Sequence, residues 1–211
     1  MTRDLRLIAL GDSTLLSSGD PEGLGWLGRV AAATRARLTP IELTVYNLGV
    51  GGETSVEVRA RWDEVERRLA PEADVRLLLS CGYNDTFAEP GAPPTIAPEE
   101  SSAHLAALLQ SASDRRLPAF VAGPPGSPDP ARAERLSDLS ARFAATCADA
   151  GVPFADVATQ STPEAPWVRD ARAGDGTHPG PAGYEALAAL VLEAGWWTWL
   201  DPARSRRTQG V

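Results

Sequence analysis

The sequence is poor in the residues that build disulfide frameworks and metal sites. It has two cysteines and two histidines among its 211 residues. Cys81 ends an expected strand and Cys147 lies in an expected helix, so both are interpreted as small buried apolar residues. No disulfide framework follows from such a pair. The chain also lacks enough His and Cys for a usual zinc ligand set, so we expect no metal.

Long apolar runs are missing as well. The apolar stretch at residues 5–10 is too short for the hydrophobic region of a signal peptide, and no small-residue cleavage site follows it. The run at residues 187–192 is too short, and too close to Glu193, to span a bilayer. We therefore expect a cytoplasmic protein with no integral membrane segment.

An excess of positive charge is also missing. The chain carries 28 acidic and 20 basic residues, a net charge of −8, and its isoelectric point is near 4.8. Nucleic acids and anionic membrane surfaces would repel such a chain. Arginines and acids are interspersed at residues 59–68, a pattern typical of solvated helix faces. The partner we expect is a small molecule.

Motifs for nucleotides and for one large hydrolase class are absent. The string Gly49-Val50-Gly51-Gly52 matches neither the GxGxxG fingerprint nor a P-loop with its lysine, so nucleotide binding is not expected. Ser13 is followed by Thr14 and Leu15, so it is not the serine of a GxSxG elbow. We expect no cofactor.

Short β-branched runs alternate with longer helical stretches along the whole chain. This alternation predicts an α/β fold with a parallel sheet covered on both faces. We expect one domain over residues 1–211, with residues 196–211 as a C-terminal tail. Expected strands are residues 5–10, 41–47, 75–80, 119–122 and 153–156, and expected helices are residues 25–38, 55–69, 98–116, 130–150 and 181–194.

Residues suited to chemistry follow four of these strands. Ser13 comes after the first strand, Gly52 after the second and Asn84 after the third, while Asp175 and His178 come after the fifth. Ligands of parallel sheets bind beyond the carboxyl ends of the strands. The sequence therefore predicts that these residues share one edge of the sheet.

A hydroxyl, an imidazole and a carboxylate in this group suit acyl transfer. Ser13 offers a nucleophile just before an expected helix start. Packing does not explain His178, which stands among Gly, Pro, Asp and Thr, and Asp175 can accept a hydrogen bond from its Nδ1. The alternatives are a serine that only caps a helix and an Asx turn beside an incidental histidine. The other histidine, His104, lies mid-helix and is interpreted as a core or surface residue.

Hydrogen-bond donors for an oxyanion are available nearby. The amide of Asn84 is a neutral donor, and the glycines of residues 49–52 let a backbone N–H approach a substrate closely. Both strings could equally be turns. Because Gly51 and Gly52 are adjacent, the backbone donor is ambiguous by one residue.

Together the strings resemble the four sequence blocks of the GDSL esterases and lipases, the SGNH hydrolases. Gly11-Asp12-Ser13 resembles the first block and residues 47–55 the second. Gly82-Tyr83-Asn84-Asp85 resembles the third, and Asp175-Gly176-Thr177-His178 resembles the last. The resemblance implies a flavodoxin-like three-layer α/β/α sandwich with a five-stranded parallel sheet.

The resemblance also implies a role for each residue. Ser13 would be the nucleophile, His178 the base and Asp175 the group that orients it. The oxyanion donors would be the Ser13 N–H, the Gly52 N–H and the Asn84 side chain, with Gly52 chosen because it precedes an acid-Thr-Ser stretch. No substrate-binding residue is assigned.

The expected activity is hydrolysis of carboxylic esters of small or lipid-like acyl substrates through an acyl-enzyme on Ser13. An acyltransferase or thioesterase of a biosynthetic pathway would use the same triad. A non-catalytic binding module and a flavin protein are alternatives of other classes. The first block lacks the usual glycine soon after the serine, and we expect Leu15 and Leu16 to reshape the acyl pocket there.

The C-terminal string Trp196-Trp197-Thr198-Trp199 is unusually aromatic. One interpretation is a helix packed on the sheet with its last turn under the N-terminal strand. The other is an exposed patch that contacts a lipid, a carrier protein or a second copy in a homodimer.

Overall fold

The expected strands form one all-parallel sheet in the computed structural model, which describes residues 2–201. Its strand order is β2-β1-β3-β4-β5, the order of flavodoxin-like folds. The sandwich predicted from the sequence is confirmed. The strands are β1 (Arg3–Gly11), β2 (Ile41–Gly49), β3 (Asp74–Ser80), β4 (Ala119–Ala122) and β5 (Phe154–Ala155).

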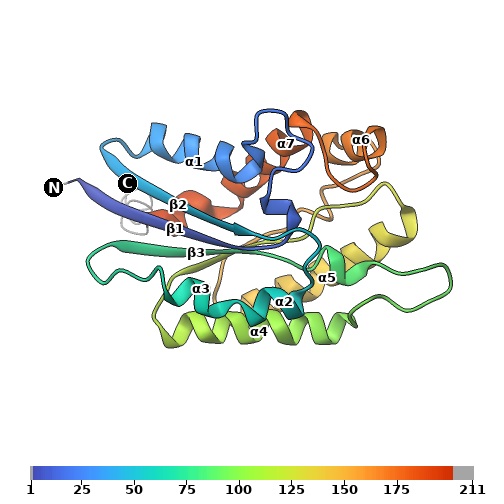
Figure 1. The fold of residues 1–211 in the computed structure, drawn as a ribbon, viewed down its shortest axis with the longest axis horizontal. Helices are drawn as coiled ribbons and strands as arrows, with labels where there is room; N and C mark the ends of the chain where they lie inside the picture. Colours follow the sequence, from blue (N-terminus) through green and yellow to red (C-terminus); the bar gives the residue numbers. More distant parts are fainter. Residues whose placement is uncertain (1, 202–211) are drawn as a thin grey trace, which may run out of the picture.

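Alternate residues of the central strands face opposite sides of the sheet, so each strand contributes to two cores. Leu5 and Leu7 of β1 belong to one core, and Ile8 and Leu10 belong to the other. The first core is covered by α1 (Gly25–Arg37), α6 (Pro166–Ala173) and α7 (Pro181–Val191), the upper layer of Figure 1. The second is covered by α2 (Ser55–Ala60), α3 (Trp62–Glu66), α4 (Pro98–Asp114) and α5 (Pro130–Asp149).

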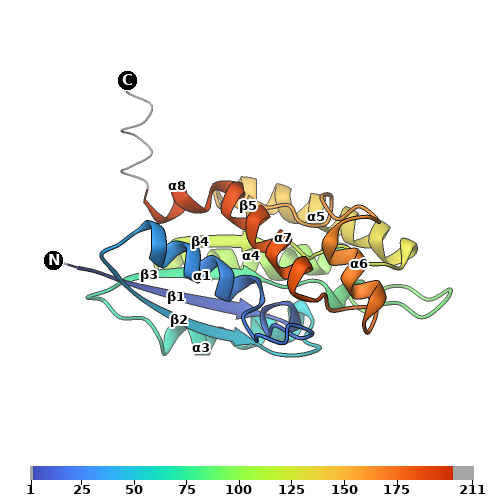
Figure 2. The ribbon, with the colours of Figure 1, turned by 90° about the horizontal axis from the view of Figure 1, so that it is seen from above.

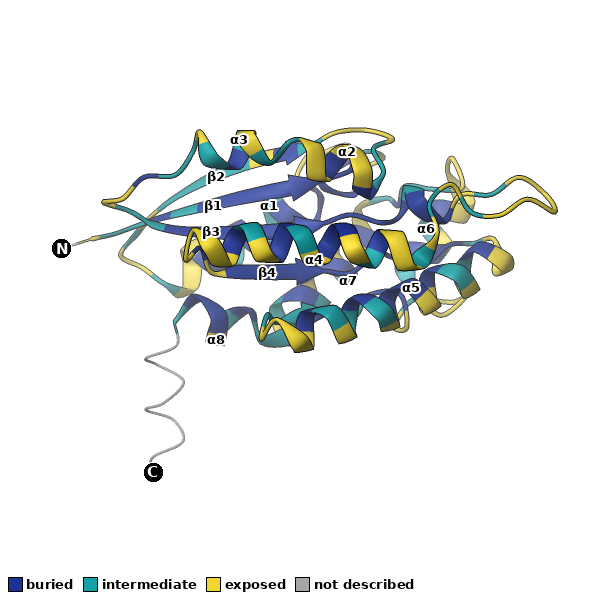
Figure 3. Ribbon diagram, turned by 90° about the horizontal axis from the view of Figure 1, so that it is seen from below, coloured by how far each residue is buried: buried dark blue, intermediate teal, exposed yellow. Residues whose placement is uncertain are grey.

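Helices cover the faces of the sheet and leave the loops at the strand ends uncovered. Figure 2 shows α1 and α7 running side by side over the sheet. Figure 3 shows the central strands β1, β3 and β4 largely dark and buried beneath helices whose outer faces are exposed, while the edge strand β2 is mostly teal. The central strands are thus used for packing, and the loops at the carboxyl ends of the strands carry polar groups.

The C-terminal tryptophans close the amino end of the sheet. Trp196 and Trp199 are 1% and 8% exposed and belong to the core under α1 and α7. Their rings contact Phe120 of β4 at centroid distances of 5.5 and 5.4 Å. The interpretation of a segment packed on the sheet is confirmed for these residues. The segment forms α8 (Trp197–Leu200), and residues 202–211 of the expected tail lie outside the described part.

The expected helix at residues 55–69 is interrupted, and this prediction was wrong in that respect. Arg61 leaves helical geometry, with φ −91° and ψ 18°, between α2 and α3. The break lets the Arg61 side chain turn back toward the ends of β1 and β2.

The last helix breaks at residue 194, where the sequence prediction ended it, because Ala194 and Gly195 leave helical geometry. Residues Leu192–Trp196 form a wider turn in which Gly195 has a φ of 95°. A glycine adopts that backbone conformation without a Cβ clash. The sequence analysis also missed α6, which lies in a stretch rich in Pro, Ser and Thr.

Cys81 and Cys147 are free and buried, as predicted. Burial raises the pKa of the Cys147 thiol to about 12, so this thiol stays protonated and behaves as a small apolar side chain. In the described part of the chain, no helix is both long and apolar enough to cross a membrane.

Candidate active site

Ser13 lies where β1 ends and a short 3₁₀ turn, Ser13–Leu15, begins. Asp12 caps that turn because its Oδ1 accepts a hydrogen bond from the Thr14 N–H at 2.9 Å. The Asp12 N–H donates to the carbonyl oxygen of Ser80 at the end of β3. Ser13 is therefore fixed at the carboxyl edge of the two central strands, as predicted, and is 5% exposed.

Asp12 directly precedes Ser13 in the sequence, and its carboxyl group is fully buried. Burial raises its pKa to about 6, and the hydrogen bond from the Thr14 N–H opposes that rise. The charged form of Asp12 at neutral pH therefore costs stability.

His178 and Asp175 form a side-chain pair in the loop between α6 and α7. The imidazole Nδ1 lies 2.8 Å from Asp175 Oδ2. A carboxylate only accepts hydrogen bonds, so Nδ1 carries the proton. Asp175 Oδ1 accepts two more bonds, from the N–H groups of Thr177 and His178 at 2.8 and 2.7 Å. Within residues 2–201, the buried Nε2 of His178 has no hydrogen-bond partner.

The ionisation of Asp175 follows from these contacts. Partial burial would raise its pKa, but the hydrogen bonds from the His178 side chain, the His178 N–H and the Thr177 N–H lower the pKa to about 2. Asp175 is thus a carboxylate over the whole neutral range, as a group that orients an imidazole must be.

The serine loop and the histidine loop touch each other. Tyr184 of α7, the helix after the histidine loop, donates its hydroxyl hydrogen to the carbonyl oxygen of Ser18 at 2.8 Å. A Cβ on Gly19 would lie 2.5 Å from the Pro179 carbonyl oxygen and 3.7 Å from the His178 Cβ. Only glycine permits this approach. Ser13 and His178 are not hydrogen-bonded to each other in this structure.

Asn84 and Gly52, the expected side-chain and backbone oxyanion donors, lie on loops that contact each other. Asn84 donates one amide hydrogen to the Glu53 carbonyl oxygen at 2.8 Å, which leaves its second amide hydrogen available. Gly52, next to Glu53, is exposed and has a φ of 79°. The loop after β2 and the loop after β3 are therefore joined at this point.

Arg61 joins the ends of β1 and β2 to the loop after β2, and the sequence analysis did not find it. Its guanidinium donates to the carbonyl oxygens of Gly11 and Leu48 at 3.0 and 3.1 Å. It also pairs with the Glu53 carboxylate at 2.6 Å. A guanidinium has five donors and can hold several acceptors at once. No sequence signal marks Arg61, because the contacts depend on the break between α2 and α3.

Asp85 and His104 hold the start of α2. Asp85 Oδ1 accepts a hydrogen bond from the Ser55 N–H at 2.7 Å. His104 Nδ1 lies 2.9 Å from the Ser55 hydroxyl oxygen. Ser55 is completely buried, so this second serine–histidine pair is inaccessible to a substrate and serves packing.

The two leucines after Ser13 have different surroundings. Leu15 is buried against Gly11 and Gly49, where a Cβ would lie within 2.9 Å of it. Leu15 is thus a core residue and does not line an open pocket, contrary to the expectation. Leu16 is 44% exposed, and its Cδ1 lies 3.7 Å from where Gly51 would carry a Cβ.

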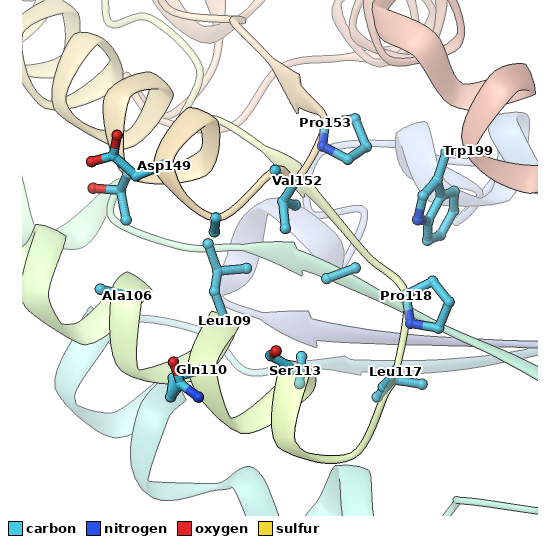
Figure 4. A pocket seen from close by; sticks show the side chains of 15 residues that line it. Ala106, Leu109, Gln110, Ser113, Leu117, Pro118, Asp149, Val152, Pro153 and Trp199 are labelled. Carbon is cyan, nitrogen blue, oxygen red and sulfur yellow. The ribbon is translucent and has the colours of Figure 1, made fainter.

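Two hollows lie at opposite ends of the sheet. One, of about 600 Å³, is lined by His178 and Asp175 together with Gly19 of the serine loop. The other, of about 620 Å³, lies between the C-terminal ends of α4 and α5 and is walled by Trp199 (Figure 4). The described residues contain no group of three or more His, Cys, Asp or Glu that could hold a metal ion.

Comparisons with known proteins agree with this arrangement. The model of the GDSL-like Lipase/Acylhydrolase family matches residues 9–186. No curated protein sequence matches the chain.

Solved structures of the same fold include esterases. A catalytic mutant of Axe2, an acetylxylan esterase from Geobacillus stearothermophilus, is 20% identical over 94% of this chain and 97% of that chain, with a TM-score of 0.72. The lipase/acylhydrolase from Enterococcus faecalis is 19% identical over 92% of this chain and 95% of that chain, with a TM-score of 0.70. TesA is 21% identical over 93% of this chain and 98% of that chain, with a TM-score of 0.67. The chain belongs to the GDSL-like lipase/acylhydrolase family of carboxylic ester hydrolases.

Proposed function

We propose that this protein hydrolyses carboxylic esters through an acyl-enzyme on Ser13, with His178 as general base and Asp175 as its orienting group. The observation that carries the proposal is the Asp175–His178 pair. It fixes Nδ1 as the protonated nitrogen and leaves Nε2 buried and unpartnered among the described residues, on a loop that touches the serine loop.

The steps follow from these roles. His178 Nε2 takes the proton of the Ser13 hydroxyl as its Oγ bonds to the ester carbonyl carbon. The bond to the leaving oxygen then breaks, and the proton on Nε2 passes to that oxygen. Water attacks the acyl-enzyme with His178 again as base, releasing the acid and restoring Ser13. Nucleophile–base hydrogen bonds commonly tighten only once a substrate is bound.

The carbonyl oxygen gains negative charge in each tetrahedral intermediate. The N–H groups of Ser13 and Gly52 and the second amide hydrogen of Asn84 are the donors that we assign to it. Donors that are fixed before reaction stabilise such a charge without reorganisation. Support comes from the bond between Asn84 and Glu53, which sets the amide orientation beside Gly52.

The expected substrate is a small-molecule ester or thioester, and we keep the expectation of a cytoplasmic protein. The similar folds named as an acetylxylan esterase and a lipase/acylhydrolase favour ester substrates. Contact with a carrier protein or a second copy through the C-terminal segment stays a hypothesis. Trp197, half-buried and stacked on Arg37 at 4.4 Å, is the tryptophan of that segment left to take part.

Replacement of Ser13 by alanine tests the proposal. We expect Ser13→Ala to fold normally and to lose p-nitrophenyl acetate hydrolysis by a factor on the order of 10⁴ or more. Ser18→Ala is the matched control, because Ser18 lies in the same loop and uses its backbone carbonyl in the bond from Tyr184. Full activity in Ser13→Ala would exclude Ser13 as the nucleophile. An absence of esterase activity in the wild type would favour a binding module.

A further inference from the structure

Arg132, in the first turn of α5, carries a buried positive charge. The residue is 9% exposed, and within residues 2–201 it forms no ion pair with a carboxylate. Burial lowers the pKa of its guanidinium, which nevertheless stays charged. The first turn of a helix also lies at the positive end of the helix dipole, which disfavours a cation. Both placements cost stability, and such local costs are typical of residues that serve a site.

The guanidinium of Arg132 binds the turn that carries Asn84. Its Nη2 donates to the Tyr83 carbonyl oxygen at 2.9 Å, and its Nε donates to the Thr86 hydroxyl oxygen at 3.3 Å. The Thr86 hydroxyl donates in turn to the same Tyr83 carbonyl oxygen at 2.9 Å. These three groups therefore form a closed set of hydrogen bonds at the 3₁₀ turn Asn84–Thr86.

Aromatic rings from the two ends of this turn contact the same guanidinium. Its Cζ lies 4.0 Å from the centroid of the Tyr83 ring and 5.7 Å from the centroid of the Phe87 ring. Such cation–π contacts offset part of the cost of a buried charge. Tyr83 and Phe87 directly precede and follow the turn. Arg132 thus contacts the turn at both of its ends.

A second set of contacts ties the turn to the start of α2. Asn84 donates to the Glu53 carbonyl oxygen, and Asp85 accepts a hydrogen bond from the Ser55 N–H. Asn84 therefore lies between the contacts from α2 and those from α5, and both sets direct its second amide hydrogen. A misplacement of about 1 Å in a group of this kind can cost about a hundredfold in rate.

We propose that Arg132 is a positioning residue for the Asn84 oxyanion donor. It acts through the Tyr83 carbonyl oxygen and the Thr86 hydroxyl, and it needs no contact with the substrate. This inference rests on the proposed function, in which Asn84 binds the oxyanion. Removal of the Arg132 guanidinium should therefore lower kcat only while Asn84 is present.

A double-mutant cycle between Arg132→Met and Asn84→Ala tests this dependence. Methionine has an unbranched apolar side chain but donates no hydrogen bonds. With p-nitrophenyl acetate, we expect Arg132→Met to lower kcat by about 10–100-fold with little change in KM. In the Asn84→Ala background, we expect the same substitution to lower kcat by less than about threefold. A residue that only stabilised the fold would not show this difference in kcat.

Two further variants keep the test decisive if Arg132→Met does not fold. Arg132→Lys retains the charge but lacks the planar fork of donors, so its kcat should lie between those of Arg132→Met and the wild type. Thr86→Val keeps the side-chain shape and removes the hydroxyl between Arg132 and Tyr83, so it can take the place of Arg132→Met in the cycle. Arg142→Met is the control on the same helix, because the Arg142 ion pairs are at the surface.

The outcomes separate the two proposals. An equal fold-loss of kcat from Arg132→Met with and without Asn84, or no loss in either background, would overturn the positioning role while the esterase function stands. An equal loss in Arg142→Met would overturn it as well. If Asn84→Ala keeps the kcat of the wild type, the oxyanion assignment of the proposed function fails, and the role of Arg132 fails with it.

Discussion

The two ends of the sheet differ in how their polar groups are paired. At the amino end, Arg3 and Arg76 both pair with Asp74 and donate to the carbonyl oxygens of Leu200 and Trp199. At the carboxyl end, Asp85 and His178 each bury a polar atom that has no partner within the described residues. Unpartnered buried polar atoms are therefore more frequent at the carboxyl end, although the amino end has one as well, Trp199 Nε1.

Exposed apolar side chains show the same contrast. In the described part of the chain, the large apolar side chains that are exposed gather at the carboxyl edge, on or beside loops that follow β1, β2 and β3. They are Leu16, Leu24, Val50, Val56 and Phe87. Exposed apolar side chains and unpaired polar groups lower stability, and proteins commonly retain them where a ligand binds. The predictions below compare the two ends.

The largest effect should come from the histidine at the carboxyl edge. We expect His178→Ala to lower kcat for p-nitrophenyl acetate by roughly 10⁴-fold, because proton transfer to and from Ser13 is lost. His104→Ala, which breaks the buried pair with Ser55, should keep kcat near that of the wild type. If His104→Ala abolished turnover and His178→Ala did not, the catalytic base would be misassigned.

Asn84 should have the next largest effect. Asn84→Ala removes one proposed oxyanion donor, and we expect kcat to fall by about 10²–10³-fold with a smaller change in KM. The measurement is a full kcat and KM determination, with circular dichroism to show that the fold is kept. A rise in KM at unchanged kcat would mean that Asn84 binds the ground state instead.

Arg61 couples stability to the site. Arg61→Met leaves the Gly11 and Leu48 carbonyl oxygens and the Glu53 carboxylate without this donor. We expect the free energy of unfolding to fall by about 2–4 kcal/mol, together with a lower kcat, since the Glu53 loop carries Gly52. Arg67→Met is the control, because its pair with Asp63 is exposed and such pairs contribute little. An equal stability loss in both variants would contradict the role of Arg61.

Asp12 should make stability depend on pH. Its folded pKa of about 6 lies above the ordinary value of 3.8, so its contribution to stability is present below 3.8 and is lost as pH rises through 6. Asp12→Asn can still accept the Thr14 hydrogen bond but does not ionise. The variant should therefore gain stability relative to the wild type between pH 4 and 7, by at most about 3 kcal/mol. Urea unfolding at both pH values checks this, and a parallel shift of the two proteins would contradict it.

The amino end should affect stability alone. Arg76→Met removes the bond to the Trp199 carbonyl oxygen and the pair with Asp74. We expect a loss of about 1–3 kcal/mol in the free energy of unfolding with kcat/KM unchanged at temperatures where the protein stays folded. A lower kcat without unfolding would show that the two ends are coupled.

Much of the fold could be predicted from the sequence because its strands are short apolar runs between clear helix signals. Pro98, Pro130 and Pro181 each begin a helix as expected. Pro166 gives the same signal for α6, whose buried residues are Trp167, Val168 and Ala171. That signal was overlooked because the surrounding stretch is rich in turn-forming residues.

The site could be predicted only where the residue type and its neighbours in the sequence indicate a chemical role. Ser13, Asn84, Asp175 and His178 stand out by type and place in the sequence, and the structure puts each of them on a loop at the carboxyl edge. Arg61 and Asp85 did not stand out, because their roles come from contacts with residues distant in the sequence. The different surroundings of Leu15 and Leu16 likewise depend on which of them faces Gly11 and Gly49.

The nucleophile can be tested most directly by treating the wild type with a fluorophosphonate and mapping the adduct by peptide mass spectrometry. One adduct per chain at Ser13, greatly slowed in His178→Ala, is the predicted result. An adduct at another serine, or none in a preparation that hydrolyses esters, would contradict the assignment of Ser13 as the attacking hydroxyl.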